Sequence, residues 1–155
     1  MNREKYAAIQ QSLGWKTTPV DFTTKPYTGV RVHGNFAFVS GSLAYSGGEL
    51  LYRGRIGETV SVDDAKKSAA LSVINCLDLI DQSIGLEKVE AVLKLTGYLS
   101  CSEEIGEHPV ILNAGSEVLI EVFGEAGKHA RAALGIHTLP FGGSVEVEMV
   151  VSLKE

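Results

Sequence analysis

The sequence is poor in cysteine, in positive charge and in long hydrophobic runs. Only two of the 155 residues are cysteine, Cys76 and Cys101, and they have no C-x-x-C spacing, so two free thiols are expected rather than a disulfide framework or a zinc knuckle. No apolar run approaches the roughly 20 residues that span a bilayer, and the first 15 residues lack the apolar centre of a signal peptide. We therefore expect a cytoplasmic protein without a membrane partner.

Basic residues are outnumbered, with 14 lysines and arginines against 19 acidic residues and a formal net charge of −5. This charge repels phosphate backbones, so nucleic-acid binding is not expected. Histidines 33, 108, 129 and 137 are scattered without metal-ligand spacing, which predicts no metal site. Phosphate-binding loops, G-x-G-x-x-G and G-x-S-x-G are also absent, which argues against nucleotide transfer and serine hydrolase chemistry.

What is present is ordinary globular composition, 45% hydrophobic and 21% charged, in a chain of about one domain's length. We expect a single domain, with residues 1–19 as a helical N-terminal extension and residues 20–155 as the core. Helical spacing of apolar residues predicts a short helix over 2–13, a six-turn helix over 61–85 with Ser61 as its N-cap, and a helix over 109–123 with Pro109 in its first turn.

Period-two patterns predict the strands 30–32 and 36–40 around a His33-Gly34-Asn35 turn, a short strand at 50–52, and the strands 89–99, 130–136 and 145–153. This order favours an α+β fold with two long helices on one face of a sheet. The other face would remain uncovered in a lone chain. Because Val145, Val147, Met149 and Val151 form an apolar set facing away from Glu146 and Glu148, an oligomer is expected.

One charged residue interrupts an apolar strand, Arg131 in the segment His129-Ala-Arg-Ala-Ala-Leu-Gly135. A guanidinium cannot lose its charge and is costly to bury unpaired. Arg131 therefore either pairs with a protein carboxylate, for which Glu146 and Glu148 are the nearest candidates, or binds an anionic ligand.

Several segments together resemble the reactive intermediate deaminases, also called YjgF-like or L-PSP endoribonuclease-like proteins. They are Pro26-Tyr27 to Ser40-Gly41, Asn113, Ala130-Arg131, Leu139-Pro140 and Glu146-Val147-Glu148, and the resemblance spans about residues 20–153. The N-terminal helix and the Tyr52-Arg53-Gly54-Arg55 segment are similar to a longer subgroup of that family.

The resemblance implies a homotrimer of chorismate-mutase-like subunits, with a mixed sheet and ligand clefts between neighbouring chains. It implies hydrolysis of small imine or enamine intermediates, such as 2-aminoacrylate, to 2-keto acids and ammonia, without a cofactor. In this family the residue matching Arg131 holds the substrate carboxylate and the one matching Glu146 assists the water. Those matching Tyr27, Ser40, Asn113 and Ala133 line the cleft.

Each of these residues also has a structural interpretation. Tyr27 could pack on the hairpin, the hydroxyl of Ser40 could bond nearby backbone, and Asn113 could serve helix packing. Ser42 stands where better-known deaminases often carry glutamine, and Ala133 where several have cysteine, so the substrate could differ. The alternative functions are binding or sensing of a keto acid without turnover and, third, the endoribonuclease or translation-inhibitor activity attached to some relatives.

Overall fold

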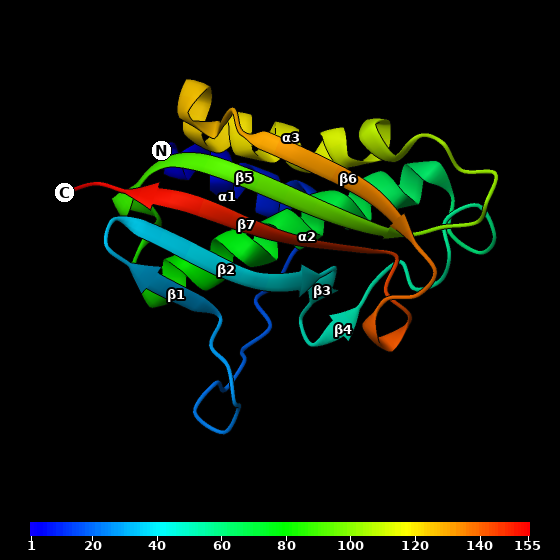
Figure 1. Cartoon of the computed structure of the whole chain (residues 1–155), viewed down its shortest axis with the longest axis horizontal. Helices are drawn as coiled ribbons and strands as arrows, with labels where there is room; N and C mark the ends of the chain where they lie inside the picture. The colour runs from blue at the N-terminus through cyan, green and yellow to red at the C-terminus, as the bar shows by residue number, and fades with distance from the viewer.

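The computed structural model describes all 155 residues as a five-stranded mixed sheet with two long helices on one face (Figure 1). This is the predicted α+β architecture. Its helices are α1 (Arg3–Ser12), α2 (Val62–Ser83) and α3 (His108–Phe123). Its strands are β1 (Val30–His33), β2 (Phe36–Leu43), β5 (Val89–Ser100), β6 (Ala130–Ile136) and β7 (Val145–Leu153), with β3 (Tyr45–Ser46) and β4 (Glu49–Leu50) forming a separate two-stranded ribbon.

The predicted helices form where their caps indicate. The side chain of Asn2 accepts a hydrogen bond from the Lys5 amide to begin α1, and Ser61 does the same from the Asp64 amide to begin α2. Pro109 occupies the first turn of α3, where its missing N–H costs nothing. Short 3-10 turns at Leu86–Lys88, Gly124–Gly127 and Pro140–Gly142 follow or precede the strands. None of the helices is long and apolar enough to cross a membrane.

The sheet has the strand order β1-β2-β7-β5-β6, so β1 and β6 are its edges. All neighbours are antiparallel except β5 and β6, which run parallel because α3 connects them as a crossover. The hairpin β1–β2 turns at Gly34-Asn35, as predicted, and β1 reaches only as far as the pairing of Val30 with Val39. The Ser40 amide still donates to the Gly29 carbonyl oxygen, and the residues of β2 beyond Ser40 have no strand on this side and form a free edge.

The core lies between the sheet and the helices, and it corrects one prediction. Val145, Val147, Met149 and Val151 are at most 2% exposed and belong to the core under the helices, not to an uncovered face. The open face instead carries Glu146, Glu148 and Val150 of β7, the 52% exposed Phe38 of β2 that pairs with Val150, and the 48% exposed Leu134 of β6. An uncovered face with large apolar side chains thus exists, but a different set of residues forms it.

The short strand predicted at 50–52 is also displaced. Gly47-Gly48 is the turn between β3 and β4, and β4 ends at Leu50. Tyr52 has a φ of 53°, outside the range of a strand. The loop that follows is fixed by Arg55, which donates hydrogen bonds to the carbonyl oxygens of Cys101 (2.6 Å) and His137 and pairs with Glu58 at 3.2 Å. Arg55 thus ties the ends of β5 and β6 together.

Candidate functional site

Arg131 lies on the edge strand β6 and extends its side chain over α3. Its Nη1 donates to Asn113 Oδ1 at 2.8 Å and to Ser116 Oγ at 3.1 Å, and its Nη2 donates to the Pro109 carbonyl oxygen at 3.2 Å. The structure thus brings Arg131 and Asn113 together. Asn113 is exposed and serves the arginine rather than the packing of α3 on α2.

Of the two alternatives for Arg131, the ion pair with Glu146 or Glu148 does not form within the chain. Arg131 pairs across the ladder with Leu95, a fully buried residue, and therefore points to the helix side of the sheet. Glu146 pairs with Tyr98 on the opposite side, and Glu148 accepts a hydrogen bond from the Tyr98 hydroxyl at 2.8 Å. No carboxylate pairs with Arg131, so its charge is balanced only by neutral acceptors.

The guanidinium retains unused hydrogen-bond donors. Of its five N–H groups, three are directed at Asn113, Ser116 and the Pro109 carbonyl. The Nε–H and one Nη2–H remain, which is the number of donors that one carboxylate accepts in a bidentate pair. Ala133, two residues along β6, lies on the same face of the strand.

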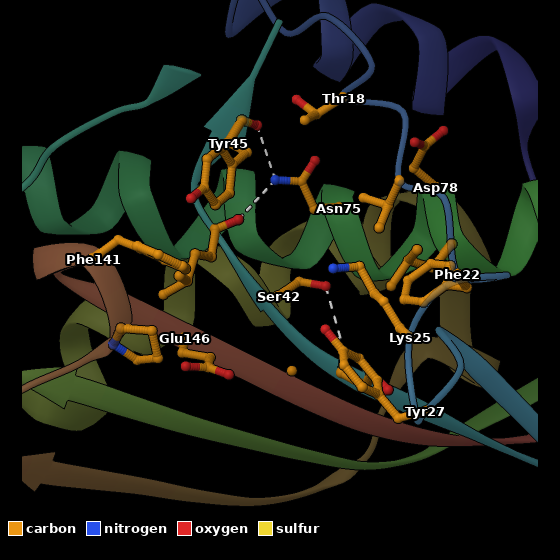
Figure 2. A pocket seen from close by; sticks show the side chains of 16 residues that line it. Thr18, Phe22, Lys25, Tyr27, Ser42, Tyr45, Asn75, Asp78, Phe141 and Glu146 are labelled. Carbon is orange, nitrogen blue, oxygen red and sulfur yellow. Dashed lines mark hydrogen bonds between the residues drawn. The ribbon is translucent and has the colours of Figure 1, made fainter. Parts of the chain in front are cut away.

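A cavity of about 280 Å³ lies at the other side of the sheet, along the free edge of β2 (Figure 2). The segment before β1, the end of β2, one face of α2 and the Pro140-Phe141 turn form its walls. Three of the predicted site residues line it: Tyr27, Ser40 and Glu146. Gly41, Ser42 and Pro140, which the family resemblance had also drawn attention to, line it as well. The sequence did not point to Lys25, Phe22, Asn75, Asp78 and Phe141.

Glu146 is the carboxylate of this cavity with no hydrogen-bond partner in the chain. It is half-buried, and burial, followed by the nearby negative charge of Glu148, raises its pKa above the ordinary value of 4.5. Its side chain lies beside Gly41, and its Oε1 oxygen occupies space that a Cβ at residue 41 would otherwise fill. A carboxyl group with a raised pKa is a stronger proton acceptor than an ordinary glutamate, which is the direction of change that a general acid–base group requires.

Substitution of Gly41 by alanine tests the position of Glu146. A Cβ at residue 41 would lie 2.1 Å from Glu146 Oε1, so the carboxylate must move, while the backbone of Gly41 is not left-handed and accepts alanine. We expect Gly41→Ala to lower kcat about tenfold for a reaction in which Glu146 transfers a proton, since reacting groups tolerate little misplacement, with Tm nearly unchanged. Gly106→Ala, which meets open space, is the matched control. An unchanged kcat in Gly41→Ala would mean that Glu146 does not act from this position.

The structural interpretation of Ser40 is confirmed, whereas Tyr27 packs against the segment before the hairpin and not against the hairpin itself. The Ser40 hydroxyl donates to the Thr28 carbonyl oxygen at 2.6 Å. The Tyr27 ring meets Phe22 edge-on, with centroids 5.8 Å apart, yet 57% of the residue is exposed to the cavity and solvent. Asn75 is fully engaged by the Leu43 and Tyr45 carbonyls and by the Trp15 indole, whereas Lys25 projects into the cavity and has no ion-pair partner.

Both cysteines are free thiols, and burial makes the Cys76 thiol unreactive. Cys76 is completely buried next to the Ser40 and Val147 carbonyls, and burial raises its pKa to about 12. Cys101 is only partly buried, and its Sγ lies 3.3 Å from His108 Nε2. Burial raises its pKa as well, so neither cysteine has the character of a nucleophile.

The two halves of the candidate site do not meet within one chain. Arg131 and Asn113 lie at the β6 edge, whereas Tyr27, Ser40 and Glu146 lie at the β2 edge, with β5 between β6 and β7. The halves also differ in face, because Arg131 points toward the helices and Glu146 away from them. Each half therefore has only one of two complementary groups: a guanidinium with unused donors at the β6 edge, and a half-buried carboxyl group at the β2 edge.

A mixed sheet in this strand order, with two helices on one face, is the chorismate-mutase-like α+β fold of the YjgF proteins. The family model described as "YjgF/chorismate mutase-like, putative endoribonuclease" matches residues 13–153. The chain therefore belongs to the YjgF family, which confirms the resemblance.

Individual relatives agree with this assignment. The chain is 30% identical to protein TCP17 of Trypanosoma cruzi over 151 residues, which cover 96% of this chain and 94% of that protein. The crystal structure of Atu1372 from Agrobacterium tumefaciens, a protein of unknown function, is 31% identical, with a TM-score of 0.85 and coverage of 98% and 96% of the two chains. A putative endoribonuclease from Shewanella oneidensis MR-1 is 26% identical, with a TM-score of 0.85 and coverage of 96% and 99%.

Proposed function

We propose that the protein hydrolyses small reactive imines and enamines that carry a carboxylate, 2-aminoacrylate being the simplest, to 2-keto acids and ammonia. The reaction takes place between neighbouring chains of a homotrimer, where Arg131 and Asn113 of one chain face Tyr27, Ser40 and Glu146 of the next. The observation that carries this proposal is an arginine with no carboxylate partner and two unused donors.

Arg131 is built to hold an anion. Its three acceptors lie along two successive turns of α3 and fix the plane of the guanidinium, so binding a carboxylate requires little further ordering of the side chain. The substrate carboxylate supplies the negative charge that the protein does not. A planar, bidentate pair also orients the imine carbon relative to the rest of the cleft.

The chemistry needs only a positioned water and proton transfer. The enamine tautomerises to the imine, and a water oxygen adds to the imine carbon while Glu146 accepts a proton from the water. Glu146 returns this proton to the nitrogen, which gives a carbinolamine. Glu146 then passes the proton of the new hydroxyl group to the nitrogen, the C–N bond breaks as the carbonyl forms, and ammonia and the keto acid are released. Because its pKa is raised, Glu146 is suited to both steps, and the open cavity beside it has room for the substrate side chain.

Release of ammonia and pyruvate from freshly generated 2-aminoacrylate tests the activity directly. We expect release faster than the spontaneous hydrolysis in buffer. Stabilisation of the protein by pyruvate without accelerated release would instead identify a keto-acid-binding or sensing protein. No acceleration with several imino acids and no stabilisation by keto acids would contradict both functions.

Complementation between two inactive variants tests whether the site lies between chains. In a trimer co-assembled from equal amounts of Arg131→Ala and Glu146→Gln chains, about one quarter of the interfaces combine an intact Arg131 with an intact Glu146. Purification through two affinity tags removes the trimers that contain one kind of chain, and every remaining mixed trimer has one such interface out of three, so we expect it to recover about one third of the wild-type activity. A site within a single chain would recover none, because every chain lacks one of the two groups.

RNA cleavage is the competing activity, because the family model and one of the structures are described as endoribonucleases. A chain with a net charge of −5 offers little attraction for a phosphate backbone. RNA cleavage that is lost together with imine hydrolysis in Arg131→Ala would assign both activities to the proposed site. Cleavage that persists in that variant would belong elsewhere.

A further inference from the structure

A chain of hydrogen bonds runs behind Arg131, on the side away from its unused donors. Ser116 Oγ lies 3.1 Å from Arg131 Nη1 and 2.9 Å from His129 Nε2, and His129 Nδ1 lies 2.6 Å from the Gly127 carbonyl oxygen. His129 precedes β6 by one residue, and Ser116 follows Asn113 by one turn of α3. Both side chains are partly buried.

The chemistry of the groups fixes the direction of every bond in this chain. A carbonyl oxygen can only accept, so Nδ1 of His129 carries the proton that is donated to Gly127. In the neutral ring Nε2 then lacks a proton and accepts one from the Ser116 hydroxyl. The Ser116 oxygen, having donated its only proton, directs its lone pairs at Arg131, whose Nη1 can only donate.

We propose that His129, acting through Ser116, is a positioning residue that holds the Arg131 guanidinium in the orientation that binds the substrate carboxylate. This inference rests on the proposed function of Arg131. It adds two residues to the anchor that do not touch the substrate, and it requires the His129 ring to be neutral with its proton on Nδ1.

The surroundings of His129 favour this form of the ring. Burial lowers the pKa of His129, and the positive charge of Arg131 lowers it further, against the raising effect of the Gly127 carbonyl. A ring with protons on both nitrogens would present a donor to the Ser116 hydroxyl and leave that hydroxyl free to turn away from its present acceptor. It would also place a second positive charge near the guanidinium.

Substitution of Ser116 or His129 should weaken substrate binding and leave the rate of the chemical step unchanged. We expect Ser116→Ala and His129→Ala each to raise KM for 2-aminoacrylate, and the dissociation constant for pyruvate, about five- to tenfold, because one hydrogen bond to a charged group is lost, with kcat little changed. His129→Gln, whose side-chain oxygen can accept from Ser116, should restore most of the affinity. His33→Ala, at the exposed end of β1 and with no side-chain hydrogen bond, is the control.

Combined variants separate positioning from general damage to the fold. Because Ser116 and His129 act in series, the double variant should bind pyruvate about as weakly as either single variant, and neither substitution should weaken binding further in the Arg131→Ala background. Unchanged affinity in Ser116→Ala and His129→Ala, with an Arg131-dependent wild type, would overturn the inference and leave the proposed function intact.

Imidazole ¹⁵N NMR measures the protonation and tautomer of the His129 ring in the absence of any ligand. We expect a protonated Nδ1 and a bare Nε2 in the wild type at neutral pH, and a change in the Nε2 resonance in Ser116→Ala. The opposite tautomer, or a doubly protonated ring, would overturn the inference. A wild type that shows the expected tautomer but neither binds pyruvate nor hydrolyses imines would contradict the proposed function, and the positioning role with it.

Discussion

Arg131→Ala is expected to lower kcat/KM for 2-aminoacrylate by about 100- to 1,000-fold, because two charge-assisted hydrogen bonds to the substrate carboxylate are lost together. The chemical groups at the Glu146 end of the cleft stay in place, so the loss should appear mainly as weaker binding. Binding of pyruvate, followed by thermal shift or calorimetry, should be lost in parallel. Ammonia release from the freshly generated imine gives the kinetic value.

Two further variants separate the shape of the anchor from its charge. Arg131→Lys keeps the positive charge but replaces the planar fork with a compact ammonium, and we expect it to recover only a small part of the activity. Lys128→Ala removes a positive charge close to the start of β6, where Lys128 pairs with Glu125 in solvent, and should be nearly neutral. If Lys128→Ala lowered kcat/KM as much as Arg131→Ala, the effect would be one of general electrostatic attraction and not of a bidentate anchor.

The fold of this protein could be predicted closely because local sequence signals mark where its helices and strands begin and end. The strands 130–136 and 145–153 coincide with β6 and β7, since turn residues flank each of them and their side chains alternate between two environments. The long helix after Ser61 likewise begins at a residue whose side chain caps it. These are local signals, and they need no knowledge of which strand lies next to which.

The face on which Arg131 lies could not be predicted, because it depends on pairing between distant strands. Alternation along β7 places Glu146 and Glu148 on one side and the core valines on the other, but it does not say which side Arg131 shares. Only the parallel register of Leu95 with Arg131 settles this, and it excludes the ion pair. The apolar set of β7 was assigned to the open face for the same reason.

Two site residues that were not predicted, Ser116 and His129, could have been found from their spacing in the sequence. Ser116 lies three residues after Asn113 on α3 and therefore on the same helix face, and His129 lies two residues before Arg131, so both could have been grouped with the arginine. Lys25 had no such signal. It lies in an irregular segment, where neither helical nor strand periodicity says which way a side chain points.

Glu146→Gln is expected to lower kcat for 2-aminoacrylate by about 100- to 10,000-fold, with KM and pyruvate affinity little changed, because the amide keeps the size of the side chain but cannot carry the proton. In the wild type, kcat/KM should fall as the pH drops and Glu146 becomes protonated. Since its pKa is raised, that fall begins at a higher pH than for an ordinary glutamate. The glutamine variant should lack this pH dependence. The rate of spontaneous hydrolysis, measured at each pH, is subtracted.

The same substitution should stabilise the protein, which separates its effect on activity from damage to the fold. A carboxyl group whose pKa is higher in the folded than in the unfolded state favours folding when protonated, so its contribution is fully present below the unfolded pKa and is lost as the pH rises through the folded pKa. Above the folded-state pKa the ionised Glu146 therefore costs stability, and Glu146→Gln should raise Tm there. The gain should shrink as the pH is lowered. An inactive glutamine variant with a lower Tm would instead mean that Glu146 supports the fold and that its loss of activity is indirect.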